Sequence, residues 1–207
     1  MTEQAKLHGF FRSSATYRVK IALALKGLTF EYLSYSLRNK EQLAPAFLAL
    51  NPQGLVPALE INGAVLTQSL AICEYLDELH PTPALLPNSV FARAKVRAAA
   101  YAIACDVHPV QNLKILNRLR ALGQGDDVVD IWARTTIEEG LAAYEKLIPA
   151  EVGPFSFGAT PSLADICLIP QLANARRFGV DLSATRIRTI EAACLALKPF
   201  APIPDSP

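Results

Sequence analysis

The sequence predicts an α/β domain followed by an all-helical domain, and three observations support this fold class. The first 80 of the 207 residues mix strand-like and helix-like apolar patterns. Pro81, Pro83 and Pro87 then interrupt regular structure, because proline lacks the backbone donor that helices and strands use. Beyond these prolines, hairpin signals stop and long helical patterns take over. We therefore expect an α/β domain over residues 1–80, a linker over 81–89 and a helical domain over 90–207.

The α/β domain begins with a short apolar run, Leu7 to Phe11, that is typical of a buried strand. Tyr17 to Lys26 places apolar residues at helical spacing, and Gly27 stands where a left-handed residue would end that helix. Phe30 to Tyr35 alternates between apolar and polar residues, which predicts a second strand. Glu41 to Leu50 predicts a second, short helix.

A hairpin and a third helix complete this domain. Asn62-Gly63 separates the apolar runs 56–61 and 64–66, and this dipeptide is the strongest short hairpin signal. Gln68 to Leu79 then returns to helical spacing. The resulting order, strand-helix-strand-helix-strand-strand-helix (βαβαββα), predicts a mixed sheet with helices packed on it.

The second domain has only helical patterns. One extends from Val90 to about Arg120, with an interruption near Pro109, and another from Val128 to Leu147. Ser162, with an acidic residue three positions later, precedes a further apolar run, which is the pattern of a helix-start capping box.

Composition excludes several classes of function. Lys and Arg total 20 against 19 for Asp and Glu, and no polybasic run occurs, so binding to nucleic acid or a membrane surface is not expected. No apolar run reaches the ~18 residues of a membrane span. The four cysteines lack CxxC spacing, and the first residues do not resemble an export signal. We expect a cytoplasmic protein with reduced, mostly buried cysteines.

Most familiar catalytic motifs are missing from the sequence. It has no GxSxG elbow, no P-loop, no GxGxxG after a strand and no HExxH. Cys105, Asp106 and His108 lie close together, but the chain has only three histidines and no second cluster to complete a tetrahedral set. We therefore expect no metal site.

The turn between the first strand and first helix, Arg12-Ser13-Ser14, is a candidate anion site. A helix N-terminus offers backbone N–H groups and a positive dipole end, and a serine hydroxyl can donate to a bound anion. If the anion is a thiolate, these groups lower its pKa from about 8.5. The alternative is that Ser13 or Ser14 only caps the helix, and this segment alone favours capping.

Two further features indicate an acidic peptide as the ligand. Gln68-Ser69 opens another helix, whose N–H groups and hydroxyl could bind a carboxylate. The Val56-Pro57 bond is expected to be cis, which would expose the backbone of Val56 to an extended peptide. Two anion sites and an open backbone edge suit a small acidic peptide that carries a thiol, which is glutathione.

Longer runs resemble the zeta class of the glutathione transferases over nearly the whole chain. Residues 12–23 (RSSATYRVKIAL) resemble the class motif Ser-Ser-Cys-x-Trp-Arg-Val-Arg-Ile-Ala-Leu, and residues 49–57 (ALNPQGLVP) resemble Leu-Asn-Pro-x-x-x-Val-Pro. Residues 106–113 (DVHPVQNL) and 168–178 (LIPQLANARRF) match further class-typical runs. The resemblance implies a thioredoxin-like first domain, a helical-bundle second domain and a homodimer. It also implies glutathione as cofactor and the isomerisation of maleylacetoacetate to fumarylacetoacetate.

The resemblance assigns site residues position by position. The glutathione would be bound by Ser13, Ser14, Gln42, Val56, Gln68, Ser69, His108 and Asn112. Either serine could hold the sulfur. Arg177 would bind a carboxylate of the cis-dicarboxylate substrate, with help from Arg12, and the family usually has Gln where His108 stands.

Two departures from the class motif bear on the mechanism. Ala15 replaces the cysteine and Tyr17 the tryptophan, so no protein thiol is expected at this helix start. The isomerisation can still use the thiolate of glutathione, which would add to the cis double bond, allow rotation and leave by elimination.

Several alternatives remain open from the sequence. One is the same isomerisation of maleylpyruvate, and another is a general transferase that conjugates glutathione to small electrophiles. A third is a non-catalytic interaction module, although that function would not require Ser13, Gln68 and Ser69.

Overall fold

The computed structural model describes residues 4–150, 153–183 and 185–201, which fall into two compact units. One unit contains the described chain up to Leu85 together with Lys198 onward, and the other extends from Leu86 to Leu197. The sequence pattern, in contrast, assigns all of 90–207 to the helical domain. The chain returns to the first unit because Phe200 is fully buried there and its carbonyl accepts a hydrogen bond from the Tyr17 hydroxyl.

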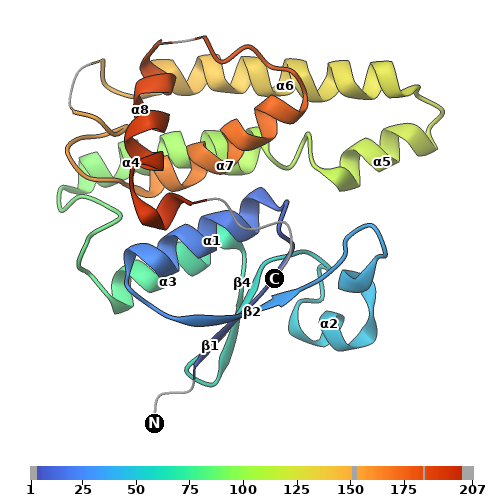
Figure 1. The fold of residues 1–207 in the computed structure, drawn as a ribbon, viewed down its shortest axis with the longest axis horizontal. Coiled ribbons are helices and arrows are strands. Elements are labelled where there is room, and N and C mark those ends of the chain that lie inside the picture. Colours follow the sequence, from blue (N-terminus) through green and yellow to red (C-terminus); the bar gives the residue numbers. More distant parts are fainter. Residues whose placement is uncertain (1–3, 151–152, 184, 202–207) are drawn as a thin grey trace. The chain divides into compact units, whose positions relative to one another are not determined.

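A mixed sheet forms the base of the first unit (Figure 1), as the sequence predicts. Its strand order in the described residues is β2-β1-β3-β4. β1 (Ala5–Gly9) pairs in parallel with β2 (Phe30–Ser34) and antiparallel with β3 (Ala58–Ile61). β4 (Ala64–Thr67) continues from β3 through a hairpin in which Asn62 and Gly63 both have positive φ, as this tight turn requires.

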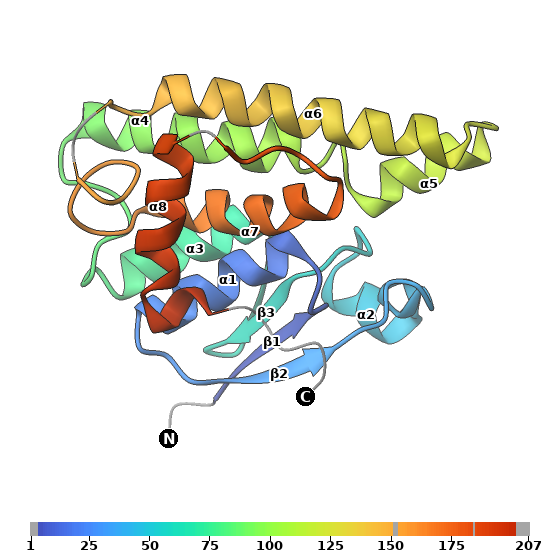
Figure 2. The same ribbon diagram turned by 45° about the horizontal axis from the view of Figure 1, so that its top comes forward.

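Two helices pack against one another on one face of this sheet, as Figures 1 and 2 show. α1 (Ser14–Leu25) and α3 (Ser69–Leu79) meet through fully buried side chains. These side chains are Val19, Ile21, Ala22, Leu23, Ile72, Cys73 and Leu76. α1 ends as the sequence predicts, because Gly27 adopts φ 67° just beyond it.

The predicted helix over 41–50 is wrong as one element, because it is split in two. η1 (Glu41–Leu43) is a single 3₁₀ turn, and α2 (Pro45–Leu50) follows it. Ala44 is extended, with ψ 146°, because the ring of the following proline disfavours the helical conformation at the preceding residue. Proline itself is well suited to the first turn of α2, where its missing N–H has no helical partner.

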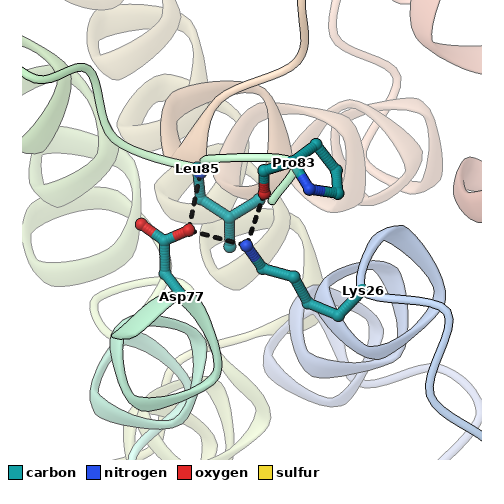
Figure 3. A network of polar contacts seen from close by, with 4 residues as sticks. All are labelled: Lys26, Asp77, Pro83 and Leu85. Carbon is teal, nitrogen blue, oxygen red and sulfur yellow. Dashed lines mark hydrogen bonds and ion pairs between the residues drawn. The ribbon is translucent and has the colours of Figure 1, made fainter. Parts of the chain in front are cut away.

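A buried ion pair attaches the linker to the first unit (Figure 3). Lys26 Nζ, on a fully buried side chain, donates to Asp77 Oδ1 at 2.7 Å and to the carbonyl of Pro83. The same carboxylate oxygen accepts from the backbone N–H of Leu85 at 2.8 Å. These contacts join the end of α1, α3 and the linker, which explains why the first unit extends to Leu85.

The second unit is helical, as expected. α4 (Val90–Tyr101) continues into the π-helical η2 (Ala102–Val107), and α5 (Leu113–Ala121) follows the predicted interruption near Pro109. α6 (Asp126–Leu147), α7 (Leu163–Arg177) and α8 (Thr185–Leu195) complete it. No helix of the described residues is long and apolar enough to cross a membrane.

The predicted capping box at the start of α7 is confirmed, and it belongs to a larger buried network. Asp165 is fully buried, and its Oδ2 accepts from the backbone N–H of Ser162 at 2.7 Å. Its Oδ1 accepts from the backbone N–H and hydroxyl of Ser156, which is also hydrogen-bonded to the Tyr144 hydroxyl. Burial raises the pKa of Tyr144, so this phenol stays neutral. The network ties α6 and the loop before α7 to the start of α7.

Candidate functional site

Ser13 is the N-cap of α1, so the capping role that the sequence left open is real. Its Oγ accepts from the backbone N–H of Thr16 at 3.2 Å, and its own N–H donates to the carbonyl of Phe10. A hydroxyl that accepts one bond still has its O–H to donate, so capping does not prevent Ser13 from binding an anion. Ser14 is the first helical residue and is buried, whereas Ser13 is half-exposed.

The turn that carries these serines is held tightly. Gly9 ends β1, and a Cβ there would collide with the side chain of Thr16. Thr16 Oγ1 also accepts from the backbone N–H of Phe10, at 3.4 Å. These contacts hold the start of α1 against the end of β1, and Arg12 in the same turn is exposed.

The start of α3 is a second candidate anion site, and it differs from α1 in having no side-chain cap. Its N-cap residue, Gln68, has φ 68°, a left-handed conformation that costs free energy in a non-glycine residue and is often found at functional sites. The Gln68 side chain donates instead to Gln53 Oε1 at 2.7 Å. The first-turn N–H groups and the helix dipole are thus available to a carboxylate.

A buried arginine lies beside this helix start. Arg18 is 2% exposed, and its Nη1 donates to Ser69 Oγ at 3.3 Å. Its Nε and Nη2 are buried without a hydrogen-bond partner among the described residues. Arg18 thus places a cationic guanidinium, which has no ion-pair partner among the described residues, next to Ser69. Sequence reasoning missed it, because a basic residue on a helix is normally placed on the solvent face.

One loop brings the other predicted residues of the first unit together. The Val56–Pro57 bond is cis, as predicted, and Val56 lies just before β3. In the same loop, Gly54 packs against the segment that carries Gln42: a Cβ there would lie 2.6 Å from the side chain of Leu43 and 3.4 Å from the backbone carbonyl of Gln42. Gln53 of this loop is the partner of Gln68. Gln42, Val56 and Gln68 are therefore connected through residues 51–56. Gln42 Oε1 is buried and has no hydrogen-bond partner in the part of the chain that the structure describes.

In the second unit, His108 and Asn112 flank a short turn between helices. His108 ends η2 and is half-buried, and its backbone N–H donates to the carbonyl of Ile103. Asn112 is the N-cap of α5, and its Oδ1 accepts from the backbone N–H groups of Lys114 at 3.1 Å and Ile115 at 3.3 Å. Capping therefore engages the carboxamide oxygen, and a ligand would meet the amide N–H₂.

The two neighbouring arginines at the end of α7 have different surroundings. Arg176 makes a double ion pair with Glu191 of α8, Nη1 to Oε1 at 2.6 Å and Nη2 to Oε2 at 2.5 Å. These charge-assisted bonds raise the pKa of Arg176 and commit its guanidinium to α8. Arg177 is exposed, and its Nη1 donates to Asn174 Oδ1 at 3.5 Å. Arg177 is thus the better placed of the two to bind a carboxylate.

The described residues contain no group of three or more His, Cys, Asp and Glu side chains that could hold a metal ion. Their cysteines form no disulfide: Cys73, Cys167 and Cys194 are buried and Cys105 is exposed.

Comparisons with known proteins agree with this geometry. Residues 3–78 match the family model of the glutathione S-transferase N-terminal domain, and residues 91–196 match that of the C-terminal domain. The chain is 48% identical over 199 residues to a maleylpyruvate isomerase of Ralstonia sp, covering 94% of both proteins. It is 45% identical over 204 residues to a maleylacetoacetate isomerase of Rhizobium meliloti, covering 97% of this chain and 95% of that protein.

Solved structures show the same similarity. One is a zeta-class bacterial maleylpyruvate isomerase in its holo form, with a TM-score of 0.91, 48% identity and 94% coverage of both chains. Another is a maleylacetoacetate isomerase of Methylobacterium extorquens with bound malonate and glutathione. It has a TM-score of 0.92, 37% identity and 98% coverage of both chains.

Proposed function

We propose that this chain, which belongs to the glutathione S-transferase family and to its zeta-class branch, converts maleylacetoacetate to fumarylacetoacetate with glutathione as cofactor. The observation that carries this proposal is the uncapped start of α3, where the strained Gln68 and the buried Arg18 favour a carboxylate. This helix start occurs in a chain that is 45% identical over 204 residues to a maleylacetoacetate isomerase.

The residues of the first unit fit glutathione. The start of α3 would bind one of its carboxylates through the N–H groups near Gln68 and the hydroxyl of Ser69. The backbone of Val56 would pair with its extended peptide. Gln42 Oε1, buried with no partner among the described residues, would gain a hydrogen-bond donor from a bound peptide.

The second unit would supply the remaining polar groups. His108 and the amide N–H₂ of Asn112 would contact the same cofactor, and Arg177 would bind a carboxylate of the substrate. Arg12, exposed at the turn before α1, would stabilise negative charge that develops on the substrate.

Bound glutathione supplies a thiolate that adds reversibly to the cis double bond, so that rotation and elimination yield the trans isomer and regenerate the cofactor. Ser13 would stabilise that thiolate by donating a hydrogen bond from its hydroxyl group. The Oγ already accepts a hydrogen bond from the backbone N–H of Thr16, which leaves the O–H for the thiolate. The dipole of α1 acts in the same direction. Holding substrate and cofactor together would contribute the remainder of the rate enhancement.

The test is turnover of maleylacetoacetate with glutathione far below the substrate concentration. Many turnovers for each glutathione, with the trans product and no adduct, would support the proposal. Turnover that ends once glutathione is consumed would instead indicate a conjugating transferase. Glutathione binding without either reaction would favour a non-catalytic module.

A second substrate, maleylpyruvate, is favoured by a specific observation. The maleylpyruvate isomerase of Ralstonia sp is 48% identical to this chain, against 45% for the maleylacetoacetate isomerase of Rhizobium meliloti. The same thiolate chemistry would act on both substrates, because both are cis-configured diacids. Measuring kcat/KM for each under identical conditions decides between them.

We also infer a homodimer, located in the cytoplasm, where the cysteine thiols would stay reduced. At the start of α4, the side chains of Val90 and Phe91 are 84% and 70% exposed. Adjacent exposed apolar residues of this size are typical of a protein interface. Light scattering should show a dimer of the wild-type protein and a monomer of the Phe91→Asp variant. A monomeric wild type at micromolar concentration would contradict the inference.

A further inference from the structure

A hydrogen bond between two carboxamide side chains, Gln111 and Asn174, joins the two segments of the helical unit that carry its proposed ligand-binding residues. Gln111 Oε1 accepts from Asn174 Nδ2 at 2.7 Å. Gln111 lies between His108 and Asn112, the two residues proposed to contact glutathione. Asn174 lies one helical turn before Arg177 on α7. The bond therefore connects the cofactor-binding segment with the proposed substrate-binding arginine.

This bond fixes which end of the Asn174 side chain faces Arg177. With its N–H₂ group bonded to Gln111, Asn174 presents its Oδ1 to Arg177 Nη1, at 3.5 Å. A guanidinium has only donors, so only the oxygen end of the carboxamide can accept from it. Without the acceptor on Gln111, the carboxamide of Asn174 could turn its N–H₂ group toward Arg177 and repel it.

The burial of Gln111 suggests more than a packing role. Its side chain is 1% exposed, and its Nε2 is buried without a hydrogen-bond partner among the described residues. A buried amide group without a hydrogen-bond partner lowers the free energy of unfolding. An apolar side chain of similar size would avoid this cost. Among the described residues, the bond to Asn174 is the side-chain hydrogen bond of Gln111 that such a replacement would remove.

We propose that Gln111 is a positioning residue that acts through Asn174 to orient the Arg177 guanidinium toward the substrate carboxylate. The proposal rests on the proposed function, because it takes Arg177 as the carboxylate-binding residue. Arg176, the neighbouring residue, is oriented separately by its double ion pair with Glu191. The two arginines thus bond to different side chains, and Arg177 is the one that contacts the partner of Gln111.

The test compares two probes, glutathione and dicarboxyethyl glutathione, the second of which adds two carboxylates at the sulfur. Calorimetry gives the dissociation constant of each for the wild type and for the Gln111→Met variant. We expect the variant to bind dicarboxyethyl glutathione about fivefold to tenfold more weakly, with glutathione affinity within about twofold of wild type. Gln111→Glu keeps an acceptor oxygen for Asn174 Nδ2 and should recover most of the loss.

A matched control separates positioning from general destabilisation. Gln171 is a fully buried glutamine on the same helix as Asn174, and both of its amide atoms lack a partner among the described residues. Gln171→Met should leave the affinities for both probes within about twofold of wild type. Equal losses in the Gln171→Met and Gln111→Met variants would overturn the proposal.

The Asn174→Ala variant keeps the proposal testable if Gln111→Met does not fold. Asn174 is half-buried, and Asn174→Ala removes the oxygen that faces Arg177, so it should produce the same loss for dicarboxyethyl glutathione. Combining both substitutions should add nothing further, because they interrupt one pathway. Additive losses would contradict the proposal. Failure of the wild type to bind glutathione would instead contradict the proposed function itself.

Discussion

At the residue scale, the site depends on polar side chains that also hold the structure together. Ser13 caps α1 and Asn112 caps α5, and both are proposed to contact glutathione. Their roles are compatible because a hydroxyl and a carboxamide each have a donor left after accepting a backbone N–H. Substituting such a residue therefore lowers stability and function together, and a useful variant must separate the two effects.

Ser13→Ala should lower kcat/KM about a hundredfold, since an oxyanion-type donor contributes about 3 kcal/mol. It should also lower the free energy of unfolding by about 1 kcal/mol, because the cap is lost. Ser89→Ala is the control, since Ser89 also caps a helix, α4, and is not among the proposed site residues. Steady-state kinetics and urea unfolding give the two quantities. A rate loss below about threefold for Ser13→Ala would exclude this serine as the thiolate donor.

Arg18→Met should weaken glutathione binding by about tenfold, or about 1.4 kcal/mol, while leaving the stability of the protein unchanged or higher. The two effects differ in sign because the buried charge costs desolvation in the absence of a ligand but attracts the carboxylate at α3. Lys20→Met, which removes a cation two residues further along α1, should not change the affinity. Calorimetry with glutathione and thermal unfolding measure the two effects. Unchanged affinity in the Arg18→Met variant would show that its charge does not reach the ligand.

At the element scale, apolar periodicity and turn residues predict most of the fold. The strands, the Asn62-Gly63 hairpin, the end of α1 at Gly27 and the capping box of α7 all follow from local sequence signals. The break at Ala44 could also have been predicted from the sequence, because the following proline disfavours a helical conformation there. The burial of Arg18 and the bond between Gln111 and Asn174 could not be predicted, because they depend on contacts between distant segments.

The ion pair between Lys26 and Asp77 should contribute more to stability than an exposed pair. Lys26→Met leaves a carboxylate that is only 11% exposed with the N–H of Leu85 as its remaining partner. We expect the free energy of unfolding to fall by about 3 kcal/mol, as is typical when one partner of a buried pair is removed. Arg120→Met breaks an exposed pair with Asp126 and should cost less than about 1 kcal/mol. Urea unfolding of both variants makes the comparison, and equal losses would contradict the expectation.

At the scale of the whole molecule, the first unit is assembled from both ends of the chain. Its sheet, α1 and α3 come from the first 85 residues, whereas η3 (Lys198–Phe200) returns to it after the helical unit. Phe200 is fully buried, its carbonyl accepts from Tyr17, and the carbonyl of Ala201 accepts from Lys20. The sequence did not predict this return, because a short proline-rich segment has no periodicity that indicates its partner.

Phe200→Ala should therefore weaken the first unit although the substitution lies near the opposite end of the sequence. Removing a buried phenylalanine side chain typically costs about 3–5 kcal/mol, and the loss should be felt at α1, which η3 contacts. Hydrogen exchange followed by mass spectrometry should show faster exchange in α1 and an unchanged rate in the middle of α7. Leu195→Ala, at an exposed position in α8, should alter neither helix. Because Ser13 caps α1, the Phe200→Ala variant should also bind glutathione more weakly. Equal acceleration in α1 and α7 would instead mean that the two units unfold together and that Phe200 stabilises the whole chain.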